Sequence, residues 1–299
     1  MKSLRRRLKR VRPILGTYVQ IELQGEAEEG LLNEYITEGF EAINQIDRLM
    51  SYHRSDSDLT RLNHAQPQAW ITATSPQTIE VLKAANELFL ISKGLFDIRC
   101  GMMLARWGAL PAQAQDRRYR VAIPEDTPPL EIKGMRVRKS GPWILDLGGI
   151  AKGYAVDRAV KTIQRLGVGQ RLSGLVNAGG DLRVWGNLDA PIAIRTCGGQ
   201  KDWMWPLTVG RSATATSSVR RFRCRDSSRI VSTHVQMPSG NPLKGHKTVT
   251  VLAKACLLAD ALTKIVLLGE TSVVENCLLF YKAKALIFSS DGQLEKAIG

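Results

Sequence analysis

The sequence predicts an α+β fold, in which helices and strands are mixed in layers without strict alternation along the chain. Helical patterns and short apolar strands follow one another irregularly, which disfavours a doubly wound parallel sheet. The composition, 44% apolar and 23% charged, is typical of a folded globular protein, and 299 residues are enough to bury a large core. We expect a basic N-terminal tail over residues 1–12 and one domain over residues 13–299.

The domain is predicted to begin with a strand and a helix. The segment TYVQIEL, residues 17–23, alternates apolar and polar side chains as a half-buried strand does. Apolar residues then recur at helical spacing over residues 33–50, which predicts one buried stripe along a helix.

A second helix is predicted from the signals at its two ends. Ser75 is suited to cap its N-terminus, Pro76 occupies the first helical position, and Gly94 follows the last turn. The pattern weakens over residues 109–140, where loops interrupt short strands. We expect an insertion in this part of the chain.

The second half of the chain is predicted to contain two glycine turns. WILDLGG, residues 143–149, resembles a short apolar strand entering a turn, and a helix should follow over residues 154–166. LVNAGGDLRVW, residues 175–185, predicts a strand, a Gly-Gly turn and a second strand. Further strands are expected over 190–196, 246–253 and 284–292, and a buried helix over 259–269.

The net charge of +14 suggests three kinds of partner: nucleic acid, an anionic membrane surface, or a small molecule that carries phosphate. Basic residues are concentrated in residues 1–12 and 218–229. Neither segment contains the interleaved aromatic residues that would stack on bases, so we expect no nucleic-acid partner. A phosphate-bearing ligand fits the charge better.

Targeting and redox signals favour the cytoplasm. The basic start is not followed by an apolar run long enough for a signal peptide, and no stretch of eighteen apolar residues could span a membrane. The cysteines are odd in number, far apart and without a CxxC pair, which argues against disulfides and zinc. They are Cys100, Cys197, Cys224, Cys256 and Cys277.

The segment LDLGGIAKGYAVD, residues 145–157, allows two interpretations. Gly148 and Gly149 would let the backbone approach a ligand closely, and the helix that begins near Lys152 would direct its amides at a phosphate. The string is neither GxGxxG nor GxxxxGK[ST], so no dinucleotide fingerprint or P-loop is present. A strand-to-helix turn with a solvated lysine explains it equally well.

Three further residues are candidates for a site. Asp97 lies beside a glycine just past a predicted helix, where it could simply cap a turn. His234 lies in a Gly/Pro-rich loop, a place where a histidine more often serves a site than a core. Asp260 stands within the apolar run LLADALTKIVLLG, so its carboxylate must be capped, paired or bound to a metal.

The order of these motifs resembles that of the ApbE family of flavin transferases over residues 15–269. The blocks that carry the resemblance are MSYHRSDSDLTRLN, GLFDIRCG, LDLGGIAKGYAVD, LVNAGGDLRVWG, ATSSVRR, HVQMPSGNP and ADALTKIVLLG. The resemblance implies a mixed α/β fold with FAD in a cleft between lobes. It also implies a FAD:protein FMN transferase that splits FAD with Mg²⁺, attaches FMN by a phosphoester to Thr or Ser of an acceptor protein, and releases AMP.

The resemblance also implies roles for individual residues. The flavin and FAD would be bound by Leu95, Phe96, Asp97, Asp146 and Lys152. Magnesium would be bound by the Gly149 carbonyl and the Asp260 carboxylate, and His234 would be the base that activates the acceptor hydroxyl. Two alternatives are a flavin-binding protein of the same fold without transfer activity, and a magnesium-dependent FAD hydrolase.

Some positions depart from the pattern of the family. Leu15 stands where many members have methionine, and Met237 where the histidine loop commonly has aspartate. Lys264 stands where a threonine commonly provides a second magnesium ligand. A lysine cannot bind a cation but can contact phosphate, and Thr263 points about a hundred degrees away on a helix.

Overall fold

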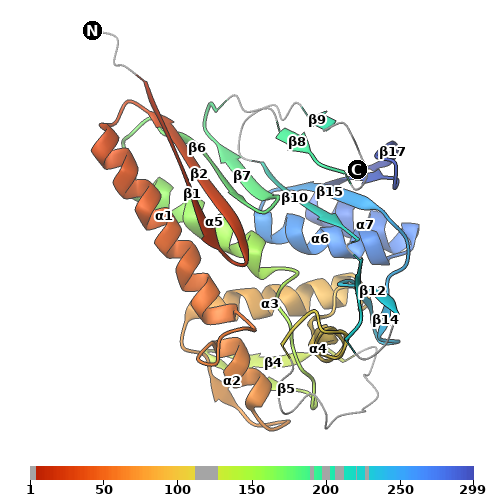
Figure 1. The fold of residues 1–299 in the computed structure, drawn as a ribbon. Coiled ribbons are helices and arrows are strands. Elements are labelled where there is room, and N and C mark those ends of the chain that lie inside the picture. The colour runs from red at the N-terminus through yellow and green to blue at the C-terminus, as the bar shows by residue number, and fades with distance from the viewer. Residues whose placement is uncertain are drawn as a thin grey trace.

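An antiparallel sheet of eight strands is the largest element of the structure (Figure 1). The computed structural model describes residues 5–111, 127–188, 192–196, 203–205, 212–219, 221–225 and 229–299. In spatial order the strands are β1 (Arg6–Ile14), β2 (Thr17–Gly25), β6 (Ser173–Ala178), β7 (Asp181–Trp185), β10 (Ala213–Ser218), β15 (Thr248–Ala253), β16 (Lys284–Phe288) and β17 (Leu294–Ile298). Every neighbouring pair in this order runs antiparallel.

Helices pack on this sheet and on each other. The helix α1 (Glu29–Met50) packs on α5 (Ala151–Leu166), which packs on α6 (Cys256–Leu268), and all three contact strands of the sheet. The helix α7 (Thr271–Tyr281) packs on α6. The predicted α+β class is therefore confirmed.

The predicted apolar patterns form the core between these layers. In β2 the side chains of Val19, Ile21 and Leu23 are fully buried, as the alternation predicted. The buried residues of α1 recur at helical spacing and include Phe40 and Ile43. Burial of this stripe stabilises the helix much more than its intrinsic propensity does.

A smaller group of elements lies beside the main sheet, in the lower part of Figure 1. It contains a three-stranded sheet of β3 (Ile71–Thr72), β5 (Arg136–Lys139) and β4 (Leu130–Lys133), with α2 (Asp58–His64), α3 (Pro76–Ile91), η1 (Ile98–Cys100) and α4 (Gly101–Trp107). The remaining strands form pairs: β8 (Ile192–Ile194) with β9 (Trp203–Trp205), β11 (Arg221–Arg223) with β12 (Ile230–Ser232), and β13 (Val235–Gln236) with β14 (Asn241–Pro242).

The predicted ends of the second helix are confirmed. The Ser75 hydroxyl accepts a hydrogen bond from the Gln77 amide at 3.3 Å, and Pro76 is the first residue of α3. Past the end of the helix, Gly94 has a left-handed φ of +82°. The chain can therefore turn sharply toward the segment that begins at Leu95.

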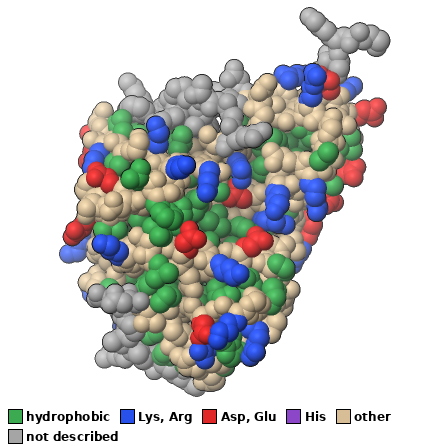
Figure 2. Space-filling model, turned by 180° about the vertical axis from the view of Figure 1, so that it is seen from behind, with side chains coloured by type: hydrophobic (Ala, Val, Ile, Leu, Met, Phe, Trp, Pro, Cys, Tyr) green, Lys and Arg blue, Asp and Glu red, His purple; other side chains and the backbone are tan. Residues whose placement is uncertain are grey.

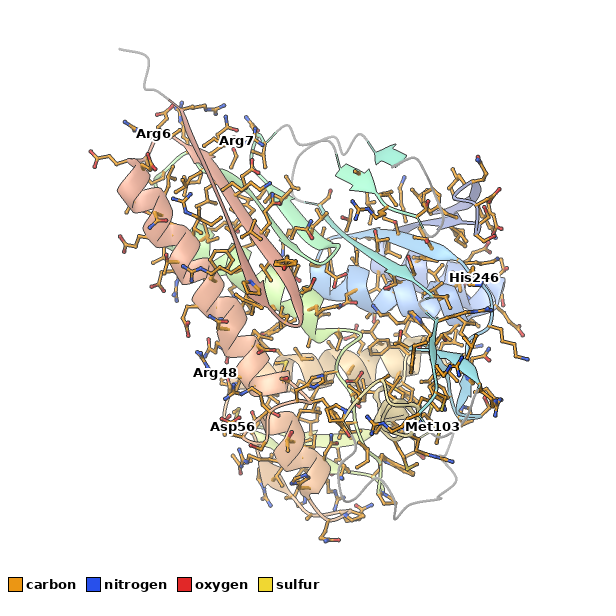
Figure 3. All side chains as sticks on the ribbon, viewed as in Figure 1. Arg6, Arg7, Arg48, Asp56, Met103 and His246 are labelled. Atoms are coloured by element: carbon orange, nitrogen blue, oxygen red, sulfur yellow. The ribbon has the colours of Figure 1, made fainter. Side chains whose placement is uncertain are left out.

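The prediction that residues 1–12 form a tail is wrong for residues 6–12. These residues belong to β1, which pairs with β2 along its whole length. Leu8 is buried, while most of the basic side chains point into solvent. Arg6 and Arg7 lie at the end of β1 far from its turn with β2 (Figure 3). Charged side chains are common on an edge strand because they discourage pairing with another chain.

The prediction of a strand over residues 143–149 is also wrong. Residues 143–147 have no regular secondary structure, 148 and 149 form a turn, and this segment pairs with no strand in the part of the chain that the structure describes. Instead the Asn63 side chain donates to the Leu145 carbonyl at 2.9 Å and accepts from the Leu145 amide at 2.8 Å. The Asp146 amide donates to the Ile98 carbonyl at 2.8 Å. A side-chain amide thus replaces the partner strand that the apolar pattern suggested.

Other expectations are settled only within the described residues. The loops and strands expected over 109–140 include β4 and β5, while residues 112–126 lie outside the described part. Cys197 lies outside it too, and the four cysteines within it are free. No helix in the described ranges is long and apolar enough to cross a bilayer.

The basic residues are spread over the face of the molecule that Figure 2 shows. On this face in Figure 2, Lys and Arg side chains lie in several places among hydrophobic and uncharged ones.

Candidate active site

A pocket of about 250 Å³ brings together segments that are far apart in the sequence. One wall comes from the chain after α3 and from α4, and another from the glycine turn before α5. The loop after β12 and the helix α6 complete it. The lining residues include Leu95, Phe96, Asp97, Asp146, Gly149, His234 and Lys264. Six of the residues implied by the family resemblance therefore meet at one pocket.

A second hollow of about 530 Å³ adjoins this pocket. Leu110, Asp146 and Gly148 line both of them. The second hollow is otherwise lined by the turn at Leu15, by the end of α1, and by the start of α5 with Lys152. Two adjacent hollows that share Asp146 in their lining suit an extended ligand.

A buried ion pair lies next to the apolar residues Leu95 and Phe96 of the first pocket. Asp97 accepts hydrogen bonds from Arg99 Nε at 2.9 Å and from Nη2 at 2.6 Å, and both side chains are almost fully buried. The guanidinium lies 4.9 Å from the centre of the Phe89 ring and 5.6 Å from the Trp143 ring. Asp97 also caps η1 through the Arg99 amide. This pairing holds the segment with Leu95 and Phe96 against the pocket.

Two lysines and two aspartates form a charged cluster beneath the glycine turn. Lys152 Nζ lies 2.6 Å from Asp181 Oδ2 and 3.5 Å from Asp260 Oδ2, and Lys264 Nζ donates to Asp260 Oδ1. The two carboxylates are 3% and 0% exposed, whereas the lysines are 31% and 18% exposed. The lysine side chains are therefore more accessible to solvent than the aspartate side chains with which they pair.

The pKa values of this cluster follow from burial and charge. Burial raises the pKa of Asp146 and of Asp181, and in Asp181 the neighbouring Asp260 carboxylate adds to the rise. Burial alone would also raise the pKa of Asp260, but Lys152 and Lys264 outweigh it and lower the pKa. Burial disfavours the charged form of Lys152, yet the two aspartates raise its pKa. Lys152 and Asp260 are thus both ionised at neutral pH.

His234 is buried in the pocket wall as a neutral base. Burial, followed by the positive charges of Lys264 and Lys152, lowers its pKa to about 4. Its Nδ1 atom is buried and has no hydrogen-bond partner among the residues that the structure describes. An unpaired nitrogen at this depth costs free energy, and the same side chain lines the pocket.

The helices α5 and α6 approach closely enough to hold the cluster because of one glycine. A Cβ atom on Gly153 would lie 2.3 Å from the Cys256 carbonyl oxygen and 2.9 Å from Asp260 Cβ. The Gly153 amide also donates to Asp260 Oδ2 at 3.1 Å. One turn further along α5, the Asp157 carboxylate accepts from the Cys256 and Leu257 amides at 3.0 and 2.9 Å. Asp157 therefore caps the N-terminus of α6.

The residues near Asp260 do not fit a magnesium ion as they are arranged. Both carboxylate oxygens already accept from N–H donors, and the Lys264 side chain lies between Asp260 and Gly149. At an effective dielectric constant of about 20, two unit charges 4 Å apart interact by about 4 kcal/mol, so a divalent ion beside an ammonium group is repelled roughly twice as strongly. Within the described ranges, no three His, Cys, Asp or Glu side chains are grouped to hold a metal.

Thr263 does not replace the missing threonine ligand. Its hydroxyl donates to the Asp260 carbonyl at 2.7 Å and lies 2.8 Å from Ser217 Oγ, and the residue is fully buried. The Asp260 carboxylate is bonded elsewhere, as the helical angle between the two positions predicted. The ammonium of Lys264 is therefore the group that faces the pocket from this turn of α6.

Sequence reasoning missed two members of the site. Asp181 follows the Gly-Gly turn of β6 and β7, which alone indicated a hairpin, and only the fold shows that it pairs with Lys152. Ser217 lies on β10, and its hydroxyl accepts from Lys264 at 3.0 Å. The SS pair in ATSSVRR was a motif of the resemblance, but nothing in the sequence placed it beside α6.

Comparison with known proteins agrees with this geometry. Residues 15–278 match the ApbE family. A relative from Vibrio cholerae named FAD:protein FMN transferase is 31% identical over 282 residues, covering 86% of this chain and 80% of the relative. A relative of the same name from Haemophilus influenzae is 25% identical, covering 87% of this chain and 80% of the relative.

A solved structure shows that the fold is shared as well. The ApbE protein of Thermotoga maritima superposes with a TM-score of 0.81 at 23% identity, covering 97% of both chains. The family match extends over most of the chain and includes every residue of the pocket named above. This chain therefore belongs to the ApbE family.

Proposed function

We propose that this chain is a FAD:protein FMN transferase, which moves FMN from FAD to a Thr or Ser hydroxyl of an acceptor protein and releases AMP. One observation carries the proposal: a buried neutral histidine with an unpaired nitrogen faces the same pocket as an ammonium group and an apolar wall. An apolar wall suits the flavin ring, the positive charge suits the pyrophosphate, and the base suits the acceptor hydroxyl.

Different residues of the two hollows would bind different parts of FAD. Leu95 and Phe96 would hold the flavin ring, and the glycine turn with Lys152 and Lys264 would hold the pyrophosphate at the junction of the two hollows. Transfer of a phosphoryl group depends mostly on positioning and on neutralising charge. The adjacent hollows and the two lysines supply both.

The chemical step needs one base. His234 would take the proton of the acceptor hydroxyl as its oxygen attacks the phosphorus of FMN. The bond from that phosphorus to the bridging oxygen breaks, and the electron pair leaves with AMP. A lowered pKa keeps His234 unprotonated in the free protein, and the negative charge of bound FAD would raise its basicity.

Magnesium is the part of the reaction that the described residues support least. The resemblance implies an ion between the Gly149 carbonyl and Asp260, where Lys264 now lies. An ion there would supply positive charge to the pyrophosphate, as the lysines do. The assay of the proposed function is therefore run both with Mg²⁺ and with excess EDTA.

The experiment measures protein-bound flavin and AMP together. The protein is incubated with FAD and an acceptor domain that carries an exposed threonine, and flavin fluorescence of the acceptor is read after denaturing electrophoresis. Equal amounts of bound flavin and AMP support transfer. AMP with free FMN identifies a hydrolase instead, and FAD binding without AMP identifies a flavin-binding protein.

A pair of histidine variants tests the base. His234→Gln should bind FAD as before but slow transfer by about 100-fold or more, because general-base catalysis contributes at least that much. His246→Gln is the matched control, since His246 is exposed and lies outside the pocket lining (Figure 3). Equal rates for the two variants would remove His234 from the mechanism.

A further inference from the structure

We infer that the Lys264 ammonium takes the place of the magnesium ion in this chain, so that FAD is bound and split without a divalent metal. The inference rests on the proposed transfer from FAD. It starts from the position of Lys264, one helical turn after Asp260 on α6. The side chain reaches back to the Asp260 carboxylate and is held there by the charge.

The ammonium group occupies the place where a cation would be bound. Its three donors have three oxygen acceptors: Asp260 Oδ1, the Asp260 carbonyl at 3.1 Å and Ser217 Oγ at 3.0 Å. The Lys264 side chain also passes 3.5 Å from the position of a Cβ on Gly149. It therefore fills the space between the carboxylate and the glycine turn, and it does so with a positive charge surrounded by oxygen.

Lys264 lines the pocket and its side chain is 18% exposed, so a movement of the side chain would bring its ammonium group to a ligand. To contact a pyrophosphate oxygen, Lys264 needs to exchange only its bonds to the Ser217 hydroxyl and the backbone carbonyl. It can keep its bond to the carboxylate. The long stem and three donors of a lysine permit this exchange without movement of the helix.

The surroundings of Asp260 keep the arrangement stable. Lys152 and the Gly153 amide bind the other carboxylate oxygen, so the buried charge has donors on both sides. A magnesium ion would have to displace Lys264 and leave an ammonium group beside it. Two lysines face the two buried carboxylates of Asp181 and Asp260, so the negative charge of Asp260 already has positive partners before FAD binds.

In the transfer step, Lys264 would stabilise the charge that develops on the leaving phosphate. The acceptor oxygen forms a bond to the FMN phosphorus, the bond to the bridging oxygen breaks, and the electron pair stays on AMP. His234 receives the acceptor proton, and Lys264 donates a hydrogen bond without changing its own protonation. FAD and the acceptor hydroxyl are the only reactants that this step consumes.

The first test compares FAD binding with Mg²⁺ and with excess EDTA, by quenching of flavin fluorescence. We expect the two dissociation constants of the natural protein to agree within about twofold, because the lysine supplies the charge in both conditions. Tighter binding by about tenfold or more with Mg²⁺ would overturn the inference, since a tenfold change reports a specific metal contact.

Variants of Lys264 test whether removing the ammonium group makes FAD binding depend on magnesium. Lys264→Thr restores a hydroxyl ligand and removes the competing charge, so its FAD binding should become dependent on Mg²⁺, and Mn²⁺ detected by electron paramagnetic resonance should bind with FAD. Lys264→Met should weaken FAD binding by about tenfold or more in either condition, because a charge-assisted contact is lost. Unchanged affinity of Lys264→Met would contradict the inference.

Controls separate this role from folding and from the proposed function. Lys161→Met removes an exposed lysine of α5 outside the pocket and should change nothing. Lys264→Met combined with Asp260→Asn removes both charges of the pair and leaves no buried carboxylate without its lysine. If circular dichroism shows that this variant is folded, weak FAD binding assigns the contact to Lys264, and unchanged binding contradicts the inference. If acceptor flavinylation fails in both conditions while FAD binding remains independent of metal, the proposed transfer is wrong and the assignment of Lys264 stands.

Discussion

Burial and neighbouring charges determine the protonation state of single residues at the pocket. His234 is the clearest case, because a loop histidine would ordinarily titrate in water near its usual value. Here it is 8% exposed, and the positive charges of Lys264 and Lys152 act on it in addition to burial. Its neutral form is therefore favoured well below neutral pH.

The pKa of His234 should be measurable directly. We expect it to titrate near pH 4 in the free protein, against an ordinary value of 6.5, when the histidine signals are followed by nuclear magnetic resonance. The His234→Gln variant identifies its signal among the four histidines. Between pH 4 and 6.5 the unfolded chain binds a proton that the folded protein does not, so this residue makes folding stability rise with pH across that window.

Addition of FAD should shift this titration upward, because the pyrophosphate offsets the charges of Lys264 and Lys152. The Lys264→Met variant should shift it in the same direction without FAD. A titration near 6.5 in the free protein would mean that His234 is solvated, and the proposed role as a buried base would then lose its main support.

Asp157 shows how a residue in a ligand-binding motif can have a structural role. It is the last residue of the segment LDLGGIAKGYAVD, one of the blocks that carry the family resemblance. In the structure it caps α6 and pairs with Arg183 on β7. Both interpretations of the segment are therefore correct for different parts of it. Its first half lines the pocket, and its second half connects α5 to α6.

At the scale of elements, the contact of α5 with α6 determines where the charged cluster lies. Gly153→Ala should destabilise the protein by about 1–3 kcal/mol or more, because the added carbon meets a backbone carbonyl that cannot move alone. Chemical denaturation measures this change. Gly30→Ala in α1 is the matched control: its Cβ meets none of the described atoms within 4 Å, and we expect a gain in stability between zero and about 1 kcal/mol. Equal effects at the two positions would show that the helices are not in close contact.

The segment before the glycine turn depends on one side chain of α2. Asn63→Ala removes both hydrogen bonds to Leu145 and leaves two buried backbone groups without partners, at a cost of about 1–3 kcal/mol each. The same variant should weaken FAD binding, because the segment carries Asp146 into the pocket. Asn33→Ala on the exposed side of α1 is the control for both measurements. If Asn63→Ala is as stable as Asn33→Ala, the segment around Leu145 is held by packing alone and not by these hydrogen bonds.

At the scale of the whole molecule, β1 completes one edge of the main sheet. Deleting residues 1–12 should lower the melting temperature and promote self-association, because β2 would become an unprotected edge strand. Thermal unfolding and analytical ultracentrifugation measure the two effects. The double substitution of Lys9 and Arg10 by Gln removes charge from the edge but keeps the pairing of β1 with β2, so it should leave the melting temperature unchanged. A truncated protein as stable and monomeric as the full chain would restore the interpretation of a tail.

The pocket itself is a property of the whole fold. The two hollows are lined by segments from the turn at Leu15 to Leu268 at the end of α6, nearly the full length of the chain. Binding of FAD should therefore raise the melting temperature of the whole protein in a single unfolding transition, since a ligand that binds only the folded state stabilises all of it.

Much of the fold follows from local patterns in the sequence. The α+β class, the buried stripe of α1, the capped start of α3, and the hairpin of β6 and β7 each depend on the spacing of apolar, capping and turn residues within a few positions. The order of the motifs also indicated the family and the residues Asp97, Asp146, His234 and Asp260.

Only the tertiary structure decided what depends on residues distant in sequence. The strand at residues 6–12 is paired because β2 lies beside it, although its charge suggests a tail. The segment around Leu145 is not a strand, because the side chain of Asn63, 82 residues earlier, satisfies its backbone. The partners of Asp260 likewise come from α5 and from Lys264, and burial makes their charges interact strongly. Sequence alone determined which chemical groups the site has; the fold determined that an ammonium group lies where a metal ion was expected.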